Sequence, residues 1–128
     1  MPNSLSSSKR YLLTFLLAAT LPLFAQTAGQ ASVDSAELPA EIKTLAAKSL
    51  LLDIAQTNSG YFAVGERGHV LTSTDGKTWT QVSNIPTRST LTSIAAMDQQ
   101  LWAGGHDGII LNSADNGKTW TRQRLDIF

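Results

Sequence analysis

Short runs of apolar and β-branched residues, separated by turn-forming residues, dominate the second half of the chain. The stretches between the runs, such as Asn58-Ser59-Gly60, are rich in Gly, Asn, Asp and Ser, which favour turns. This pattern predicts a meander of four short antiparallel strands within residues 50–88. The expected strands are residues 51–57, 61–65, 69–74 and 78–83.

The same pattern returns 40 residues later. The run AVGERGHVLTST, starting at Ala63, aligns with AGGHDGIILNSA, starting at Ala103, and the offset becomes 41 after one extra residue, Asn116. A fixed period of this size indicates a stacked repeat, and four strands per repeat are typical of a β-propeller blade. We therefore expect an all-β chain with a second blade within residues 89–128, made of strands at 91–97, 101–105, 109–114 and 119–125.

Equivalent apolar positions in the two copies predict the core, which consists of Ile54 and Ile94, Phe62 and Trp102, Val70 and Ile110, and Leu71 and Leu111. A closed propeller needs roughly four to eight blades, because each sheet covers its faces only with its neighbours. Two blades leave an apolar face open at each end. The chain is therefore expected to self-associate, to take blades from a partner, or to be a truncated piece of a longer protein, and truncation is favoured.

Each copy contains one short motif that ends in tryptophan: STDGKTW at residues 73–79 and SADNGKTW at residues 113–120. The aspartate and serine can accept or make hydrogen bonds within their own turn, the glycine can supply a positive φ, and the tryptophan starts the outgoing strand. These residue types hold a hairpin rigid, so a carbohydrate or metal role for the aspartates is the less favoured alternative. The structural residues expected are Ser73, Asp75, Gly76 and Trp79, and Ser113, Asp115, Gly117 and Trp120.

Both motifs resemble the Asp-box, S-x-D-x-G-x-x-W, of BNR-type β-propellers. The second copy fits the pattern fully, whereas the first lacks the residue between the aspartate and the glycine. The motif is fairly specific for propeller hairpins and says little about activity, because it occurs in sialidases, sortilin-like receptors and photosystem II assembly factors alike. The resemblance therefore supports the fold and leaves the function open.

The N-terminal residues have the composition of a secretory signal peptide. Lys9 and Arg10 precede an uncharged apolar stretch at residues 11–25, which is shorter than the ~20 residues of a membrane span. We expect a signal peptide at residues 1–25, with an uncleaved anchor as the alternative. Residues 26–49 are expected to be a linker and a short N-terminal segment, with a turn or two of helix at residues 41–48.

Composition narrows the classes of function. An apolar content of 42% and a charged content of 16% suit a globular protein, and the absence of cysteine excludes disulfides and thiol chemistry. Without the first 25 residues the chain has 8 basic and 10 acidic residues, so its formal charge is −2. This weakly acidic balance argues against nucleic acid as a partner.

A longer stretch resembles exported bacterial proteins related to photosystem II assembly and stability factors. The runs that carry the likeness are PAEIKTLAAKSLLLDIA, AVGERGHVLTSTDGKTW, PTRSTLTSIA and WAGGHDGIILNSADNGKTW, within residues 40–120. The resemblance implies a seven-bladed, non-enzymatic propeller that binds a protein partner, such as a membrane-protein subunit during assembly. It also implies export to the periplasm or outside the cell, or to the thylakoid lumen in a photosynthetic organism.

In photosynthetic members of that family an arginine-rich surface is implicated in partner binding. The candidate partner-binding residues here are Arg67, Arg88, His106, Arg122 and Arg124. Arg122 and Arg124 alternate on one strand, and the simpler interpretation is a solvated edge that discourages strand pairing.

No catalytic residue, metal site or cofactor is predicted. The two histidines lack a second ligand at metal spacing, and GERGHV lacks the Lys-Ser/Thr of a phosphate loop. The alternative function is an N-terminal fragment of a sialidase or glycosidase, whose arginine cluster and tyrosine nucleophile would lie beyond residue 128.

Overall fold

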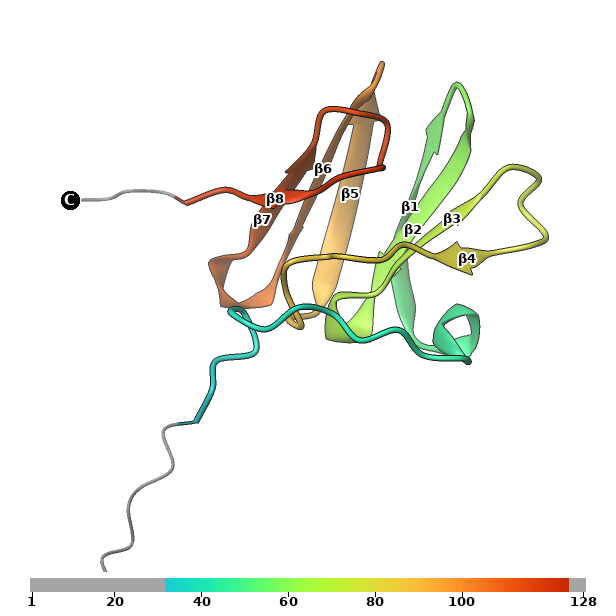
Figure 1. Cartoon of the computed structure of the whole chain (residues 1–128). Helices are drawn as coiled ribbons and strands as arrows, with labels where there is room; N and C mark the ends of the chain where they lie inside the picture. Colours follow the sequence, from blue (N-terminus) through green and yellow to red (C-terminus); the bar gives the residue numbers. More distant parts are fainter. Residues whose placement is uncertain (1–31, 125–128) are drawn as a thin grey trace, which may run out of the picture. The chain divides into compact units, whose positions relative to one another are not determined.

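The computed structural model describes residues 32–124 as two separate four-stranded antiparallel sheets (Figure 1). The signal peptide expected at residues 1–25 lies outside the described residues. In the first sheet the strand order is β1-β2-β3-β4, and in the second it is β5-β6-β7-β8. The strands are β1 (Leu51–Thr57), β2 (Gly60–Gly65), β3 (Val70–Ser73), β4 (Thr80–Gln81), β5 (Leu91–Met97), β6 (Gln100–Gly105), β7 (Ile110–Ser113) and β8 (Thr121–Arg122).

The all-β fold class and the two meanders are confirmed. The outermost strands β4 and β8 are shorter than expected, although backbone bonds from Val82 N to Val70 O and from Gln123 N to Ile110 O, each 2.8 Å, continue both ladders. Three 3₁₀ turns complete the described part of the chain: η1 (Ala46–Lys48), η2 (Glu66–Gly68) and η3 (His106–Gly108). The helix expected at residues 41–48 is shorter than predicted, because only the 3₁₀ turn η1 forms there.

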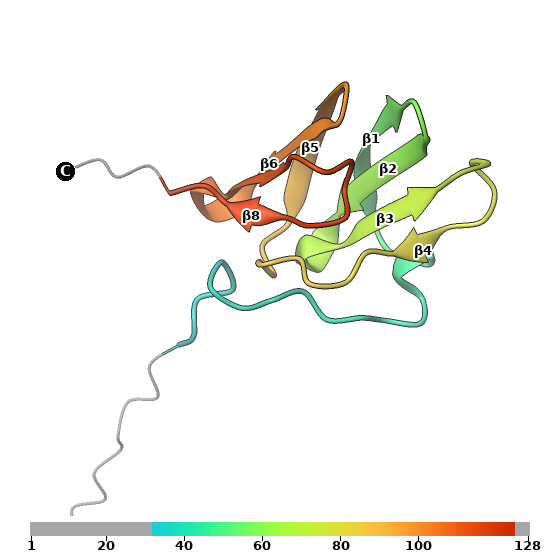
Figure 2. The same cartoon turned by 45° about the horizontal axis from the view of Figure 1, so that its top comes forward.

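The main hydrophobic core lies between the two sheets, with β1 and β5 side by side (Figures 1 and 2). Phe62 and Val64 of the first sheet pack there against Ile94, Leu101 and other apolar residues of the second. Asp53 also joins the sheets, because its Oδ1 accepts a bond from its neighbour Ile54 N and its Oδ2 accepts one from Ile94 N, both 2.9 Å. The sheets therefore pack face to face, as consecutive blades do.

Two of the eight expected core residues are wrong. Ile54 is 55% exposed and Trp102 is 47% exposed, whereas their repeat equivalents Ile94 and Phe62 are buried. Ile54 lies on the face of the first sheet that points away from the second, and Trp102 lies on the far face of the second sheet. Each therefore lacks the neighbouring blade that covers its equivalent. Of the remaining residues, Val70, Leu71 and Leu111 are buried and Ile110 is half-buried.

Residues 32–49, here called the N-terminal strap, run along one end of both sheets (Figure 2). Ala40 N donates to Ile85 O at 2.9 Å, and Lys43 N donates to the Gln81 side-chain oxygen at 2.8 Å. Toward the second sheet, Arg122 Nη1 donates to Ala36 O at 2.6 Å. The strap is therefore fixed to both blades by hydrogen bonds.

Candidate functional site

The first Asp-box turn is held by its own side chains. Asp75 Oδ1 accepts bonds from Lys77 N and Thr78 N, both 2.8 Å, and from the Ser73 hydroxyl at 3.0 Å. Ser73 Oγ in turn accepts a bond from Gly76 N at 2.9 Å, and Gly76 has a φ of 72°. The side chains of Ser73 and Asp75 are thus both used within the hairpin.

The second Asp-box turn has a similar network around Asp115 and Ser113. Asp115 Oδ1 accepts bonds from Ser113 Oγ and Thr119 N, both 2.8 Å, and the Thr119 hydroxyl donates to Asp115 Oδ2 at 2.5 Å. Gly117 N donates to Ser113 Oγ at 2.8 Å. The extra residue Asn116 has a φ of 58° and donates its backbone N–H to Gln99 O at 2.9 Å.

The tryptophans of the two motifs lie in different environments. Trp120 is 6% exposed in the core between the sheets, and its indole Nε1–H donates to Gly117 O at 3.1 Å. Trp79 is half-buried on the open face of the first sheet, against a small cluster that contains Ala63 and Leu71. The difference follows from position, because only Trp120 has a blade in front of it.

Hydrogen bonds to Asp115 make the folded state sensitive to acid. The bonds from the Thr119 hydroxyl and backbone lower the pKa of Asp115 from 3.8 to about 2. Because the folded pKa is the lower one, the carboxylate stabilises the fold above pH 4, and this contribution is lost as the pH falls from about 4 to about 2. Bonds from Thr78 and Lys77 lower the pKa of Asp75 in the same direction.

We expect Asp115→Asn to flatten the acid dependence of stability. Urea midpoints measured at pH 6 and at steps down to pH 2 should fall less steeply for the variant than for the wild type, because the variant has no proton to take up at residue 115. Asp98→Asn, in the exposed turn between β5 and β6, is the matched control. Equal losses of stability in wild type and Asp115→Asn would contradict the role of this carboxylate.

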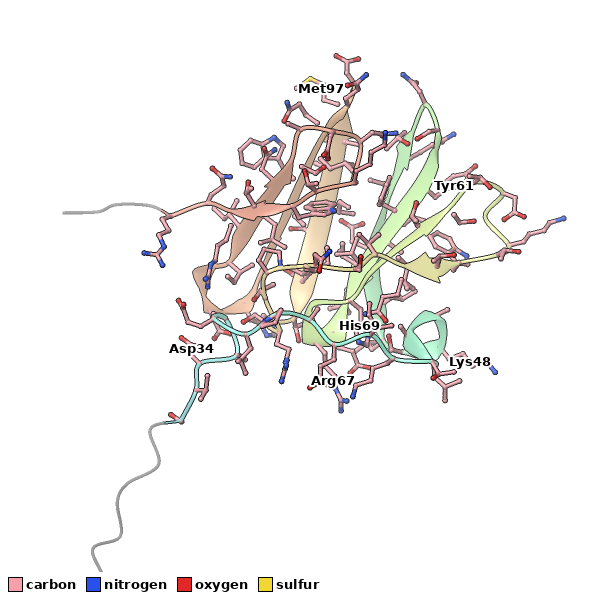
Figure 3. The ribbon with its side chains drawn as sticks, viewed as in Figure 1. Asp34, Lys48, Tyr61, Arg67, His69 and Met97 are labelled. Atoms are coloured by element: carbon pink, nitrogen blue, oxygen red, sulfur yellow. The ribbon has the colours of Figure 1, made fainter. Side chains whose placement is uncertain are left out.

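The structure brings together two of the five candidate partner-binding residues. Arg67 and Arg88 line one pocket of about 290 Å³ at the end of the blades where the strap runs. Arg67 lies in η2 and is exposed, whereas Arg88 donates from Nε to Pro39 O at 2.9 Å and pairs with Glu41 at 3.1 Å. Figure 3 shows Arg67 at this end of the molecule and Met97 at the opposite end.

The other three candidates lie elsewhere. His106 is exposed in η3 of the second blade, and Arg124 is exposed after β8. Arg122 is engaged within the chain, because its guanidinium bonds Ala36 O and pairs with Glu37 at 3.2 Å. Arg122 therefore anchors the strap, which the interpretation as a solvated edge had missed.

Sequence reasoning also missed the other four residues of the pocket, namely Ser35, Glu41, Lys43 and His69. Glu41 and Lys43 belong to the segment expected to be a linker, and their charges pair with each other. The sequence pattern does not predict that this segment lies beside η2, because the segment is held mostly through its own backbone atoms, which carry no sequence signal.

Two four-stranded sheets, each closed by an Asp-box hairpin and packed face to face, are consecutive blades of an Asp-box β-propeller. A family model described as photosynthesis system II assembly factor YCF48 matches residues 33–127. The chain belongs to this family.

Solved structures support the fold. "YCF48 bound to D1 peptide" is similar at 21% identity with a TM-score of 0.57, over 71% of this chain and 29% of that one. "YCF48 from Cyanidioschyzon merolae" is similar at 28% identity with a TM-score of 0.54, over 72% of this chain and 28% of that one. The chain thus spans under a third of these structures. Comparison with curated proteins found no significant match.

Residues 32–124 contain neither a membrane-spanning helix nor a metal-binding cluster. None of the helical segments there is long and apolar enough to cross a bilayer. In the same range, no group of His, Cys, Asp and Glu side chains is arranged to hold a metal ion.

Proposed function

We propose that this chain contributes two blades to a non-enzymatic, exported assembly factor that binds a protein subunit of photosystem II. The observation that carries the proposal is the family match over residues 33–127. It favours an assembly factor over the sialidase or glycosidase alternative. The serine and aspartate side chains of both Asp-boxes form hydrogen bonds within their own turns, which also supports a structural role for them.

The end of the blades that carries Arg67 and Arg88 is the proposed partner surface. One relative has been solved with a peptide of D1, and the partner proposed for this chain is of the same kind, a segment of a membrane-protein subunit. The proposed site of action is the thylakoid lumen in a photosynthetic organism, and the periplasm or the exterior otherwise. The open faces that carry Ile54 and Trp102 are proposed to pair with further blades or with copies of the chain.

Fluorescence anisotropy with a labelled D1 peptide and the purified chain tests the partner. We expect saturable binding that Arg67→Asn weakens by at least about tenfold, since a charged hydrogen bond contributes about 1.5–3 kcal/mol. Asparagine suits the positive φ at this position, so the variant should fold. Arg124→Asn is the matched control.

A scrambled peptide that binds equally well, or two arginine variants that weaken binding equally, would contradict the proposed surface. Light scattering on the same sample tests the open faces. A mass that stays at that of one chain over the whole concentration range would exclude pairing between copies.

A further inference from the structure

His69 is buried with one ring nitrogen that has no partner. The residue is 3% exposed, and within the described residues its Nε2 is the one buried side-chain nitrogen or oxygen without a hydrogen bond. Leaving a buried polar atom unpaired costs free energy, so such atoms are rare and call for an explanation. Neither the hydrogen bonds of the Asp-box turns nor those of the sheets involve His69 Nε2.

Hydrogen bonds fix which nitrogen of His69 carries the proton. Ser49 Oγ donates its only proton to Ala46 O at 2.6 Å, and it lies 3.0 Å from His69 Nδ1. Nδ1 must therefore donate to Ser49. In the neutral ring this leaves a lone pair on Nε2, which gains a proton only when the ring becomes charged.

His69 is one of the residues that line the same pocket as Arg67 and Arg88, and its Nε2 is buried beside that pocket. Three segments meet there: the strap with Glu41 and Lys43, η2 with Arg67, and the link between the blades with Arg88. Figure 3 shows His69 and Arg67 at this end of the first sheet. With His69 neutral, the lining has three positive side chains and one negative one, so its formal charge is +2.

The pocket already binds a carboxylate of the chain itself. Glu41 pairs with Arg88 and Lys43, and these contacts lower the pKa of Glu41. Arg67 is different, because no carboxylate among residues 32–124 lies within ion-pair distance of its guanidinium. An arginine is the side chain best suited to hold a carboxylate by two parallel hydrogen bonds.

We propose that this pocket binds a carboxylate of the partner, with Arg67 as its main ligand and the protonated His69 ring as a buried positive charge beside it. This inference depends on the proposed function in one respect, namely that the carboxylate belongs to a protein partner. An acidic side chain and a C-terminus present the same group, and the experiment below separates them.

Binding should then take up a proton. Burial lowers the pKa of His69, and Arg67 and Lys43 lower it further, while Glu66 opposes them. An anion in the pocket favours the charged ring and raises that pKa. By linkage, affinity increases as the pH falls from 7.5 toward 5.5, and it decreases again only near the carboxylate's own pKa, about 4.3 for a glutamate.

Proton NMR of the histidine rings tests the site without a protein partner. The probe is sodium acetate added to the purified chain, with sodium chloride at matched ionic strength as the reference. We expect acetate to raise the titration midpoint of His69. Acetate should bind about three- to tenfold more tightly at pH 5.5 than at pH 7.5.

Variants separate a binding role from a structural one. Arg67→Asn should abolish the acetate effect on His69, Arg124→Asn should preserve it, and His69→Gln should bind acetate without pH dependence. N-acetylglutamate α-amide and N-acetylalanine then distinguish a side-chain carboxylate from a terminal one. The carboxylate with the larger effect identifies the source.

The proposal is overturned if the His69 midpoint responds equally to acetate and chloride, or if Arg67→Asn leaves the acetate effect intact. Tighter binding of inorganic phosphate than of any carboxylate would also overturn it. Acetate binding without D1 peptide binding would support the carboxylate site and contradict the proposed partner. Peptide binding that is insensitive to His69→Gln and to pH would support the proposed partner and contradict the carboxylate site.

Discussion

Gly117→Ala is expected to destabilise the chain by about 2–5 kcal/mol, because a methyl group at residue 117 would collide with the preceding blade. A Cβ at this position would lie 2.3 Å from the ring atoms Cε1 and Cζ of Phe62, which is itself buried. The positive φ of 82° adds the strain of a left-handed conformation, about 1–2 kcal/mol. Urea denaturation monitored by circular dichroism measures the loss.

Gly108→Ala is the matched control, since Gly108 has a φ of 68° and nothing within 4 Å of its would-be Cβ. It should cost only the backbone strain of about 1–2 kcal/mol. In a double-mutant cycle, Phe62→Leu should relieve part of the Gly117→Ala defect, with a coupling of at least about 1 kcal/mol. Equal losses for the two glycine variants would contradict the contact between the blades.

Trp120→Ala is expected to cost about 3–5 kcal/mol, the usual loss when a large buried aromatic side chain is removed from a core. The variant removes a large side chain from the core between the sheets and leaves the Gly117 carbonyl without its indole donor. The loss should appear as a lower urea midpoint and as earlier thermal unfolding.

Trp79→Ala is the control at the equivalent position of the first motif. Trp79 is only half-buried, so less apolar area returns to water, and the cost should be no more than about half as large. Equal costs would mean that the open face of the first blade is covered in solution, since both indoles would then be buried to the same extent.

Local patterns predicted the strands and the Asp-box turns because both depend on nearby residues. The alternation of apolar and turn residues placed β1 and β5 at their observed bounds, and the motif spacing predicted the bonds that Asp75 and Asp115 accept. Each of these features is decided within a few residues, so the sequence carries a direct signal for it.

Burial and the pocket could not be predicted in this way, because both depend on which segments meet in space. Ile54 and Ile94 have the same pattern around them, yet only the second has a blade against it. The alternation of Arg122 and Arg124 indicated an exposed edge, whereas the position of Arg122 depends on a strap residue 86 positions away. His69 stood alone in the sequence, and its neighbours in the pocket come from three separate segments.

The strap has a consequence for the order of events during synthesis. Its residues leave the ribosome before either blade, yet Ser35 O and Ala36 O accept bonds from Arg88 and Arg122. At about 5–20 residues per second, the acceptors wait several seconds for their donors. The first described segment to be made is thus among the last to be fixed in place.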